Sequence, residues 1–259
     1  MKSCLKVGTF LQGDFYEEDE DPEKIRAIFD AGPHGITAPP VKHPAKYSDS
    51  IIETLDKVML SEAERNDARL RVLDPMAGVG RIHELDRSCV YATIGVEIEP
   101  EWATQHPGTI IADASTLPFQ GESFDATITS PAYGNRMADH HNAKDDSRRM
   151  TYKHVLGRDL SPNSGAGLQW GHPYRELHTK ILSEMVRVTK PDGLVVVNIS
   201  NHVRKGVVQH VVEWYAETMC RMALLMERVI PVPTPRMRFG ENGTLRVPYE
   251  HVIVMRKGV

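Results

Sequence analysis

The chain has 259 residues with a formal net charge of −4; 41% of its residues are hydrophobic and 25% are charged. These are ordinary values for a globular protein, and the length suits one α/β domain with insertions or at most two small domains. The slightly acidic balance argues against a protein that binds nucleic acid through bulk charge alone. We find no apolar run of membrane length, no signal peptide and no C-x-x-C pair, so we expect a cytoplasmic protein without a cysteine-based zinc site.

The first 42 residues are predicted to form an irregular arm, and residues 43–259 the main domain. An acidic run at 17–21 and the prolines and glycines that follow it favour irregular structure. A helix is expected next, because apolar residues recur with helical periodicity from Ile51 onward. Ser50 and Glu53 have the spacing of a capping box at its start.

A buried strand ending at Leu73 leads into the stretch Asp74-Pro75-Met76-Ala77-Gly78-Val79-Gly80, and a helix can start at Arg81. A strand, a glycine-rich turn and a helix form a nucleotide pocket at the carboxyl edge of a parallel sheet. Gly78 and Gly80 permit positive φ and close approach of a ligand. The pattern is neither G-x-G-x-x-G nor followed by G-K-[ST], so neither a dinucleotide nor ATP is our first expectation. The alternative is an ordinary turn between sheet and helix.

Two further strands are predicted at 91–96 and 109–112, and each ends in an acidic residue, Glu97 and Asp113. An acid at the tip of the second strand, about twenty residues after the glycine turn, is placed to accept hydrogen bonds from ribose hydroxyls. Solvated carboxylates at strand ends are the alternative.

A fourth strand at 125–129 runs into Ser130-Pro131-Ala132-Tyr133, and an insertion at 135–172 without core periodicity follows. Between positions 136 and 158 it holds six Lys or Arg and three Asp, so it is a candidate target-recognition loop. The expected nucleic-acid contacts here are Arg136, Arg148, Arg149 and Lys153. The alternative is a solvated lid. His140 and His141 have no further ligands at useful spacing, so we expect no metal.

The rest of the chain continues the alternation of helices and strands. Helical periodicity marks 174–188 and 208–222, and strands are expected at 194–200, 223–232 and 249–255. We expect Pro231, Pro233 and Pro235 to form a loop with Arg236 and Arg238, which are added to the candidate nucleic-acid contacts.

Taken in order, these motifs resemble those of the S-adenosylmethionine-dependent DNA amino-methyltransferases. The resemblance rests on D-P-x-x-G-x-G at 74–80, H-P-A-K-Y at 43–47, D-A-x-x-L-P-F at 113–119 and S-P-A-Y at 130–133. It implies an α/β fold of the Rossmann-like class I methyltransferase type, with a seven-stranded, mostly parallel sheet, helices on both faces and a reversed last hairpin. It also implies S-adenosyl-L-methionine as the cofactor. The residues that it assigns to the cofactor are Lys46, Tyr47, Asp74, Pro75, Met76, Ala77, Gly78, Gly80, Glu97, Ile98, Asp113, Ala114 and Ser130.

The turn Ser130-Pro131-Ala132-Tyr133 resembles the family's catalytic motif, and its Ser and Tyr are typical of the cytosine-N4 branch. An aromatic amine is a poor nucleophile, so the Ser130 hydroxyl and the following backbone carbonyl would hold its hydrogens and turn its lone pair toward the methyl group. Tyr133 would stack on the extruded base. Ala132 stands where the family has a second proline, which puts the usual turn geometry and the activity in question.

The sequence therefore predicts a DNA methyltransferase acting on an exocyclic amine, cytosine-N4 ahead of adenine-N6. DNA is the expected partner, with a restriction or phage-encoded protein left open, and no membrane is involved. Two alternatives stay open: an RNA methyltransferase acting on a guanine amine, and a catalytically inactive homologue that binds cofactor and nucleic acid.

Overall fold

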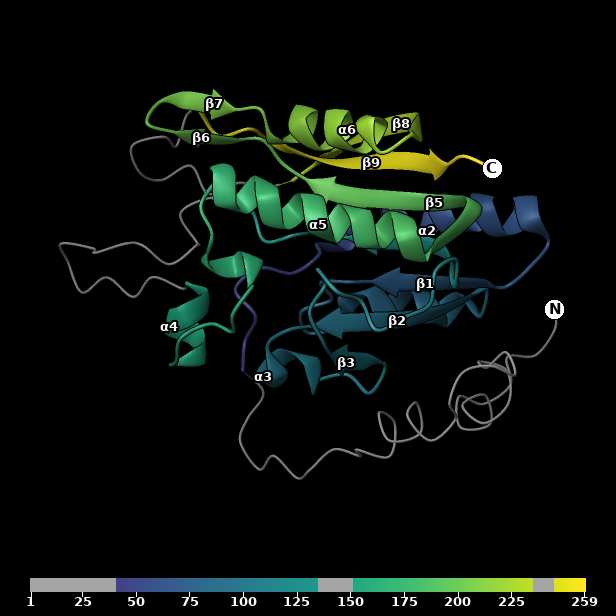
Figure 1. Ribbon diagram of the computed structural model, residues 1–259, viewed down its shortest axis with the longest axis horizontal. Coiled ribbons are helices and arrows are strands. Elements are labelled where there is room, and N and C mark those ends of the chain that lie inside the picture. The colour runs from purple at the N-terminus through teal and green to yellow at the C-terminus, as the bar shows by residue number, and fades with distance from the viewer. Residues whose placement is uncertain (1–40, 135–150, 235–244) are drawn as a thin grey trace. The chain divides into compact units, whose positions relative to one another are not determined.

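The computed structural model describes residues 41–134, 151–234 and 245–259, and seven strands of these residues form one sheet (Figure 1). The strand order is β3-β2-β1-β4-β5-β9-β8, and a separate hairpin joins β6 to β7. The strands are β1 (Leu70–Asp74), β2 (Tyr91–Glu97), β3 (Thr109–Ile111), β4 (Phe124–Thr129), β5 (Thr189–Ile199), β6 (His202–Arg204), β7 (Val207–Gln209), β8 (Leu224–Pro233) and β9 (Tyr249–Lys257).

Helices cover both faces of the sheet (Figure 1). α2 (Asp49–Asn66) and the 3₁₀ helix η2 (Arg81–Ser88) pack on one face, whereas α5 (His172–Val188) and α6 (Val211–Arg221) pack on the other. Three shorter helices complete the described part of the chain: α3 (Pro100–Ala103), α4 (Tyr152–Leu156) and the 3₁₀ helix η3 (Gly165–Gly167).

Strand direction follows the predicted pattern. β1 to β5 pair in parallel, and β9 pairs antiparallel with both β5 and β8. The reversed strand therefore lies between two strands that run the same way. Parallel strands end at one edge of a sheet, so the turns after β1, β2 and β4 meet there. The predicted sheet, mostly parallel with a reversed closing strand, is confirmed.

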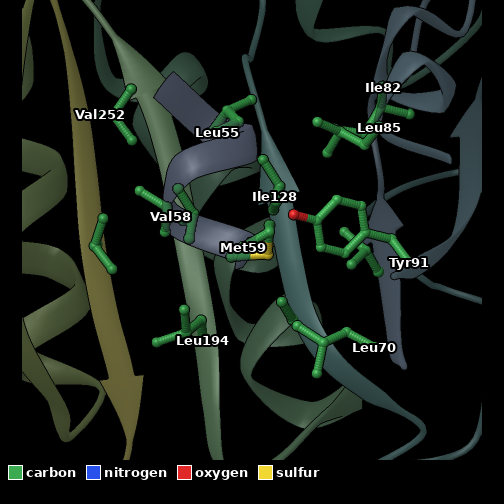
Figure 2. Close-up of a cluster of buried hydrophobic side chains, with 14 of the residues drawn as sticks. Leu55, Val58, Met59, Leu70, Ile82, Leu85, Tyr91, Ile128, Leu194 and Val252 are labelled. Carbon is green, nitrogen blue, oxygen red and sulfur yellow. The ribbon is translucent and has the colours of Figure 1, made fainter. Parts of the chain in front are cut away.

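The core beneath α2 shows why this order is stable (Figure 2). Leu55 and Met59 of α2 are fully buried against Ile128 of β4 and Leu194 of β5. Burying a side chain of this size contributes roughly 1.5–3 kcal/mol relative to leaving it exposed. The apolar stripe that the helical periodicity predicts is therefore the surface that attaches α2 to the sheet.

Local geometry differs from the prediction at several places. The cap of α2 is Ser48, whose Oγ accepts a hydrogen bond from the backbone N–H of Ile51, and not Ser50. The segment after the glycine turn is a 3₁₀ helix. Pro231 and Pro233 lie within β8 and not in a loop. An edge strand tolerates proline at alternate positions, because the missing N–H faces away from the partner strand.

The insertion also has more structure than predicted, since α4 and η3 lie in its second half. Its first half is outside the described residues, as are the predicted nucleic-acid contacts Arg136, Arg148, Arg149, Arg236 and Arg238. Among the residues that are described, none of the helices combines the length and the apolar character needed to cross a membrane.

Candidate active site

A cavity of about 430 Å³ opens where β1, β2 and β4 end. Stretches far apart in the sequence line it, among them the segment before α2, the glycine turn after β1, and the turn after β4. Most residues predicted to bind cofactor or to act in catalysis meet here. Those that line the cavity are Lys46, Tyr47, Met76, Ala77, Gly78, Glu97, Ile98, Ser130, Pro131, Ala132 and Tyr133.

The glycine turn needs its glycines. Gly78 and Gly80 have φ of +56° and +79°, a region that favours glycine. A Cβ atom at Gly80 would lie 2.7 Å from Cβ of His106, so no larger residue fits there. The backbone N–H of Met76 donates to Oδ1 of Asp74 at 3.0 Å, which fixes the turn at its start. The turn therefore presents backbone to the cavity at Gly78.

Glu97 lies at the tip of β2 and lines the cavity, as predicted. Its carboxylate accepts hydrogen bonds from the backbone N–H groups of Gly78 and Glu99, both at 2.9 Å. Burial raises the pKa of Glu97 to about 7, despite these donors. A carboxylate offers about four acceptor positions, so Glu97 can hold the glycine turn and also accept from a ligand hydroxyl.

Tyr47 and Asp74 form a buried pair. The Tyr47 hydroxyl donates to Oδ2 of Asp74 at 2.9 Å. Burial raises the pKa of Asp74 to about 6 and that of Tyr47 well above its ordinary value. Asp74 does not line the cavity; it fixes Tyr47, which does. The predicted contact of Asp74 with the cofactor stays a prediction.

Three aromatic residues that the sequence did not predict to meet form a cluster in the cavity lining. The His43 ring lies 4.4 Å from the Trp102 ring, and the Tyr152 ring lies 5.9 Å from Trp102, measured between centroids. All three line the cavity. Burial lowers the pKa of His43 to about 4, so its imidazole is neutral at pH 7. His43 belongs to the H-P-A-K-Y stretch of the resemblance, whereas no sequence pattern indicated Trp102.

The turn from Ser130 to Tyr133 is held by Asn198, which also contacts Glu250; neither residue was predicted to belong to the site. Nδ2 of Asn198 donates to Oγ of Ser130 at 3.1 Å and lies 3.4 Å from the Tyr133 hydroxyl. The same nitrogen donates to Oε2 of Glu250 at 2.9 Å. Asn198 lies near the end of β5 and Glu250 near the start of β9, and antiparallel pairing brings both to the edge where β4 ends.

Ala132, the departure from the family motif, is anchored from α5. Its carbonyl oxygen accepts a hydrogen bond from the Tyr174 hydroxyl at 3.0 Å. Tyr174 in turn lies 3.1 Å from the Tyr215 hydroxyl, which lies 2.8 Å from Nδ1 of His178. The side chains of Tyr174, Tyr215 and His178 are all buried. A hydrogen bond thus restrains the backbone at the position where the family uses a second proline ring.

The described half of the insertion packs over the cavity. Arg158 bonds to the carboxylates of Glu99, at 2.8 Å, and of Glu101. Asn163 donates to Oδ2 of Asp113 at 2.9 Å. Ser164, Gly165 and Ala166 line the cavity, and Tyr152 belongs to its aromatic cluster. We call residues 151–171 the lid segment.

Two basic residues of the lid segment have carboxylate partners. Arg158, counted among its basic residues, is committed to two carboxylates, and Lys153 forms an ion pair with Asp159. The predicted nucleic-acid contact of Lys153 stays a prediction.

A few predicted cofactor residues lie beside the cavity rather than in its lining. Oδ1 of Asp113 accepts from the backbone N–H and the hydroxyl of Ser115, both at 2.7 Å. Those outside the lining are Asp74, Pro75, Gly80, Asp113 and Ala114. In the described parts of the chain, no group of three or more His, Cys, Asp or Glu is placed to hold a metal ion.

No family model matches the chain, and no curated protein matches its sequence. Solved structures do match. The structure reported for the conversion of a disulfide bond into a thioacetal group during echinomycin biosynthesis has a TM-score of 0.50 at 14% identity, over 91% of this chain and 92% of that chain.

Two other matches are methyltransferases. Magnesium protoporphyrin IX methyltransferase from Synechocystis with bound S-adenosylmethionine has a TM-score of 0.46 at 13% identity, over 84% of this chain and 88% of that one. An S-adenosylmethionine-dependent methyltransferase from Methanosarcina mazei has a TM-score of 0.47 at 13% identity, over 73% and 93%. At such identities the likeness concerns the fold alone. The strand order is that of the Rossmann-like class I methyltransferase fold, and the match with a TM-score of 0.50 agrees with it.

Proposed function

We propose that this protein is an S-adenosylmethionine-dependent methyltransferase that modifies an exocyclic amine of a DNA base, with cytosine-N4 the first candidate. The observation that carries this proposal is one shared cavity. The glycine turn and Glu97 line it together with the turn from Ser130 to Tyr133. A methyl donor held by the first would face an acceptor held by the second.

The cavity fits the cofactor in size and in chemistry. Its volume of about 430 Å³ falls within the range of small-molecule sites, about 300–1,000 Å³. A Cβ at Gly78 would lie 3.3 Å from Nε2 of His43, so the glycine keeps backbone exposed beside the ring. Glu97 supplies a buried acceptor for ribose hydroxyls, and Lys46 and Tyr47 would lie at the methionine end.

When bound, the cofactor supplies a methyl group already activated on a sulfonium. The chain's own task is then to place the target amine. The Ser130 hydroxyl and the backbone carbonyl of Pro131 would accept the two amine hydrogens, which turns the nitrogen lone pair toward the methyl group. Well-oriented reactants gain about 7–11 kcal/mol from proximity alone, so positioning can supply most of the catalysis.

Tyr133 would carry the base itself. A base must leave the duplex stack to reach an enclosed site, and its face then stacks on an aromatic ring. Such stacking contributes about 1–3 kcal/mol per base. Arg136, Arg148, Arg149, Arg236 and Arg238 would contact phosphates, in segments that adjoin the turn after β4 and the end of β8.

The test is to identify the methylated nucleoside. Unmodified genomic DNA and total RNA are incubated with cofactor carrying a deuterated methyl group, digested to nucleosides and examined by mass spectrometry. We expect labelled N4-methyl-2′-deoxycytidine from DNA, and no label with the Ser130→Ala variant. A labelled guanine amine from RNA would instead establish the RNA alternative. No label in either polymer, from protein that binds the cofactor, would contradict the proposal and favour the inactive homologue.

A further inference from the structure

Glu250 is a buried carboxylate that lines the active-site cavity and has no role in the motifs that led to it. Glu250 is 9% exposed, and Ser130, Tyr133 and Thr234 line the same cavity. It comes from β9, the reversed strand. The family resemblance at this strand covers the pattern E-x-[IV]-x-[VI], which begins at Glu250, but it assigns the carboxylate no role. That the carboxylate lines the cavity is an observation of the structure.

Asn198 fixes the position of Glu250 relative to the turn from Ser130 to Tyr133. An ionised carboxylate can only accept, so the Asn198 atom that faces Glu250 at 2.9 Å must be the amide nitrogen. The same nitrogen faces Ser130 Oγ at 3.1 Å. The side chain of Asn198 is 1% exposed and cannot move freely. Glu250 and Ser130 are therefore held on two sides of one rigid donor, facing one cavity.

The hydrogen bond from Asn198 also constrains the Ser130 hydroxyl. One lone pair of Oγ is used by Asn198, so the other can accept from a target amine, and the hydroxyl proton is left to donate. Ser130 can thus hold an amine, but it cannot remove a proton from it. The turn by itself lacks a base.

We propose that Glu250 is the carboxylate that faces the nitrogen receiving the methyl group and accepts its proton. This inference rests on the proposed function. As the nitrogen lone pair forms the bond to the methyl carbon, the carbon–sulfur bond breaks and its electron pair stays on sulfur. The positive charge passes from sulfur to nitrogen. An N–H bond then breaks, its electron pair returns to nitrogen, and the proton passes to Glu250 and from there to water.

A carboxylate suits this position because the charge that develops on nitrogen is positive and the site is enclosed. Opposite charges interact more strongly in such surroundings than in water. A positioned general base contributes about 10²–10⁴-fold to the rate. Glu250→Gln removes the negative charge but keeps an amide oxygen that can accept the hydrogen bond from Asn198. The variant therefore removes the proposed proton acceptor and leaves Asn198 held in place.

The first test measures ligand binding and needs no knowledge of the target. Sinefungin carries an ammonium group where the cofactor carries its methyl, whereas S-adenosylhomocysteine has neither. Calorimetry on wild type should show a preference for sinefungin that falls about ten-fold in Glu250→Gln, as expected for loss of a charged hydrogen bond. Glu250→Asp should retain part of the preference.

Glu213→Gln is the matched control, since Glu213 lies outside the cavity lining, 51% exposed, where it accepts from Asn201. It should keep the full preference for sinefungin. An unchanged preference in Glu250→Gln, in protein whose melting temperature matches wild type, would overturn the inference. The outcome is separable from the nucleoside assay, because a fall in preference places the carboxylate beside the methyl position whichever substrate is methylated.

The second test measures single-turnover methyl transfer to the substrate that the nucleoside assay identifies. Glu250→Gln should be slower by about a hundred-fold with saturating cofactor, and Glu213→Gln should match wild type. A rate for Glu250→Gln within twofold of wild type would rule out Glu250 as the proton acceptor.

Discussion

At the scale of single residues, we predict that the ionisation of Glu97 links cofactor binding to pH. Burial raises its pKa to about 7, so the carboxyl is largely protonated at pH 6 and ionised at pH 8. Only the ionised form has both oxygens available as acceptors for ribose hydroxyls. We predict that cofactor affinity, measured by calorimetry, rises about ten-fold from pH 6 to pH 8, since one pH unit below the pKa leaves about a tenth ionised.

The ligand-free protein should respond in the opposite direction. The pKa of Glu97 in the folded protein lies above its ordinary value of 4.5. The contribution of the neutral carboxyl to the free energy of unfolding is therefore fully present below pH 4.5 and is lost as the pH rises to about 7. Glu97→Gln should flatten both pH dependences. If the cofactor affinity of Glu97→Gln depends on pH as steeply as that of wild type, the effect belongs to another group, such as Asp74. Burial raises the pKa of Asp74 to about 6.

Ala132 leads to a second prediction at this scale. If the hydrogen bond from Tyr174 replaces the missing proline ring, Tyr174→Phe should loosen the turn from Ser130 to Tyr133 and lower turnover by about ten-fold, the effect of one buried hydrogen bond. Restoring Pro in Ala132→Pro should leave turnover equal or higher, and Tyr174→Phe should matter less in that background. Steady-state rates of the two single variants and the double variant measure this coupling.

Tyr91→Phe is the matched control for Tyr174→Phe, because Tyr91 is also buried and its hydroxyl donates to the backbone carbonyl of Asp56, away from the site. It should change stability and leave turnover as in wild type. Equal losses of turnover in both Tyr variants would show that the effect comes from stability alone.

At the scale of elements, the lid segment is attached to the cofactor side of the cavity through charge. Glu99 has a side chain with no exposure, and its carboxylate accepts from Arg158 and from Ser161. Arg158→Ala should release the lid segment, so that Tyr152 no longer closes the aromatic cluster. We predict a cofactor affinity about ten-fold weaker and faster proteolysis within 151–171, and neither change in Arg65→Ala.

Arg65 serves as the comparison because it also pairs with two acids, Glu62 and Asp192, but outside the cavity lining. Equal cofactor affinity in Arg158→Ala and wild type would show that the lid segment does not close the cofactor side.

The elements also show where sequence patterns succeed and fail. The apolar stripe of α2 was predictable because burial against the sheet fixes its period. The N-cap of the helix was predicted at Ser50 but is Ser48, because two nearby serines offer equivalent side chains. Arg158 looked like a basic residue of a nucleic-acid loop. Its partners Glu99 and Glu101 are about sixty positions away in sequence, and composition does not show such pairing.

At the scale of the whole molecule, the sheet was predictable because turns and acids mark the end of each strand in order. The position of Glu97 followed from its distance to the glycine turn, and Ser130 followed from its place after a buried strand. Asn198 and Glu250 were not found, since they reach the site through the antiparallel pairing of β5 with β9. The β6–β7 hairpin was also missed, as each of its strands has only three residues.

The central claim is that one cavity has a cofactor side, with Glu97, and a target side, with Tyr133. It is tested most directly by measuring cofactor affinity and single-turnover methyl transfer in parallel for Glu97→Ala and Tyr133→Ala. We predict that Glu97→Ala weakens cofactor binding by about ten-fold or more, the cost of a buried hydrogen-bond partner. Tyr133→Ala should bind the cofactor as wild type does and lose about a hundred-fold or more in transfer, roughly 3 kcal/mol of transition-state stabilisation. Wild-type transfer by Tyr133→Ala on DNA and RNA, or unchanged cofactor affinity in Glu97→Ala, would contradict the claim.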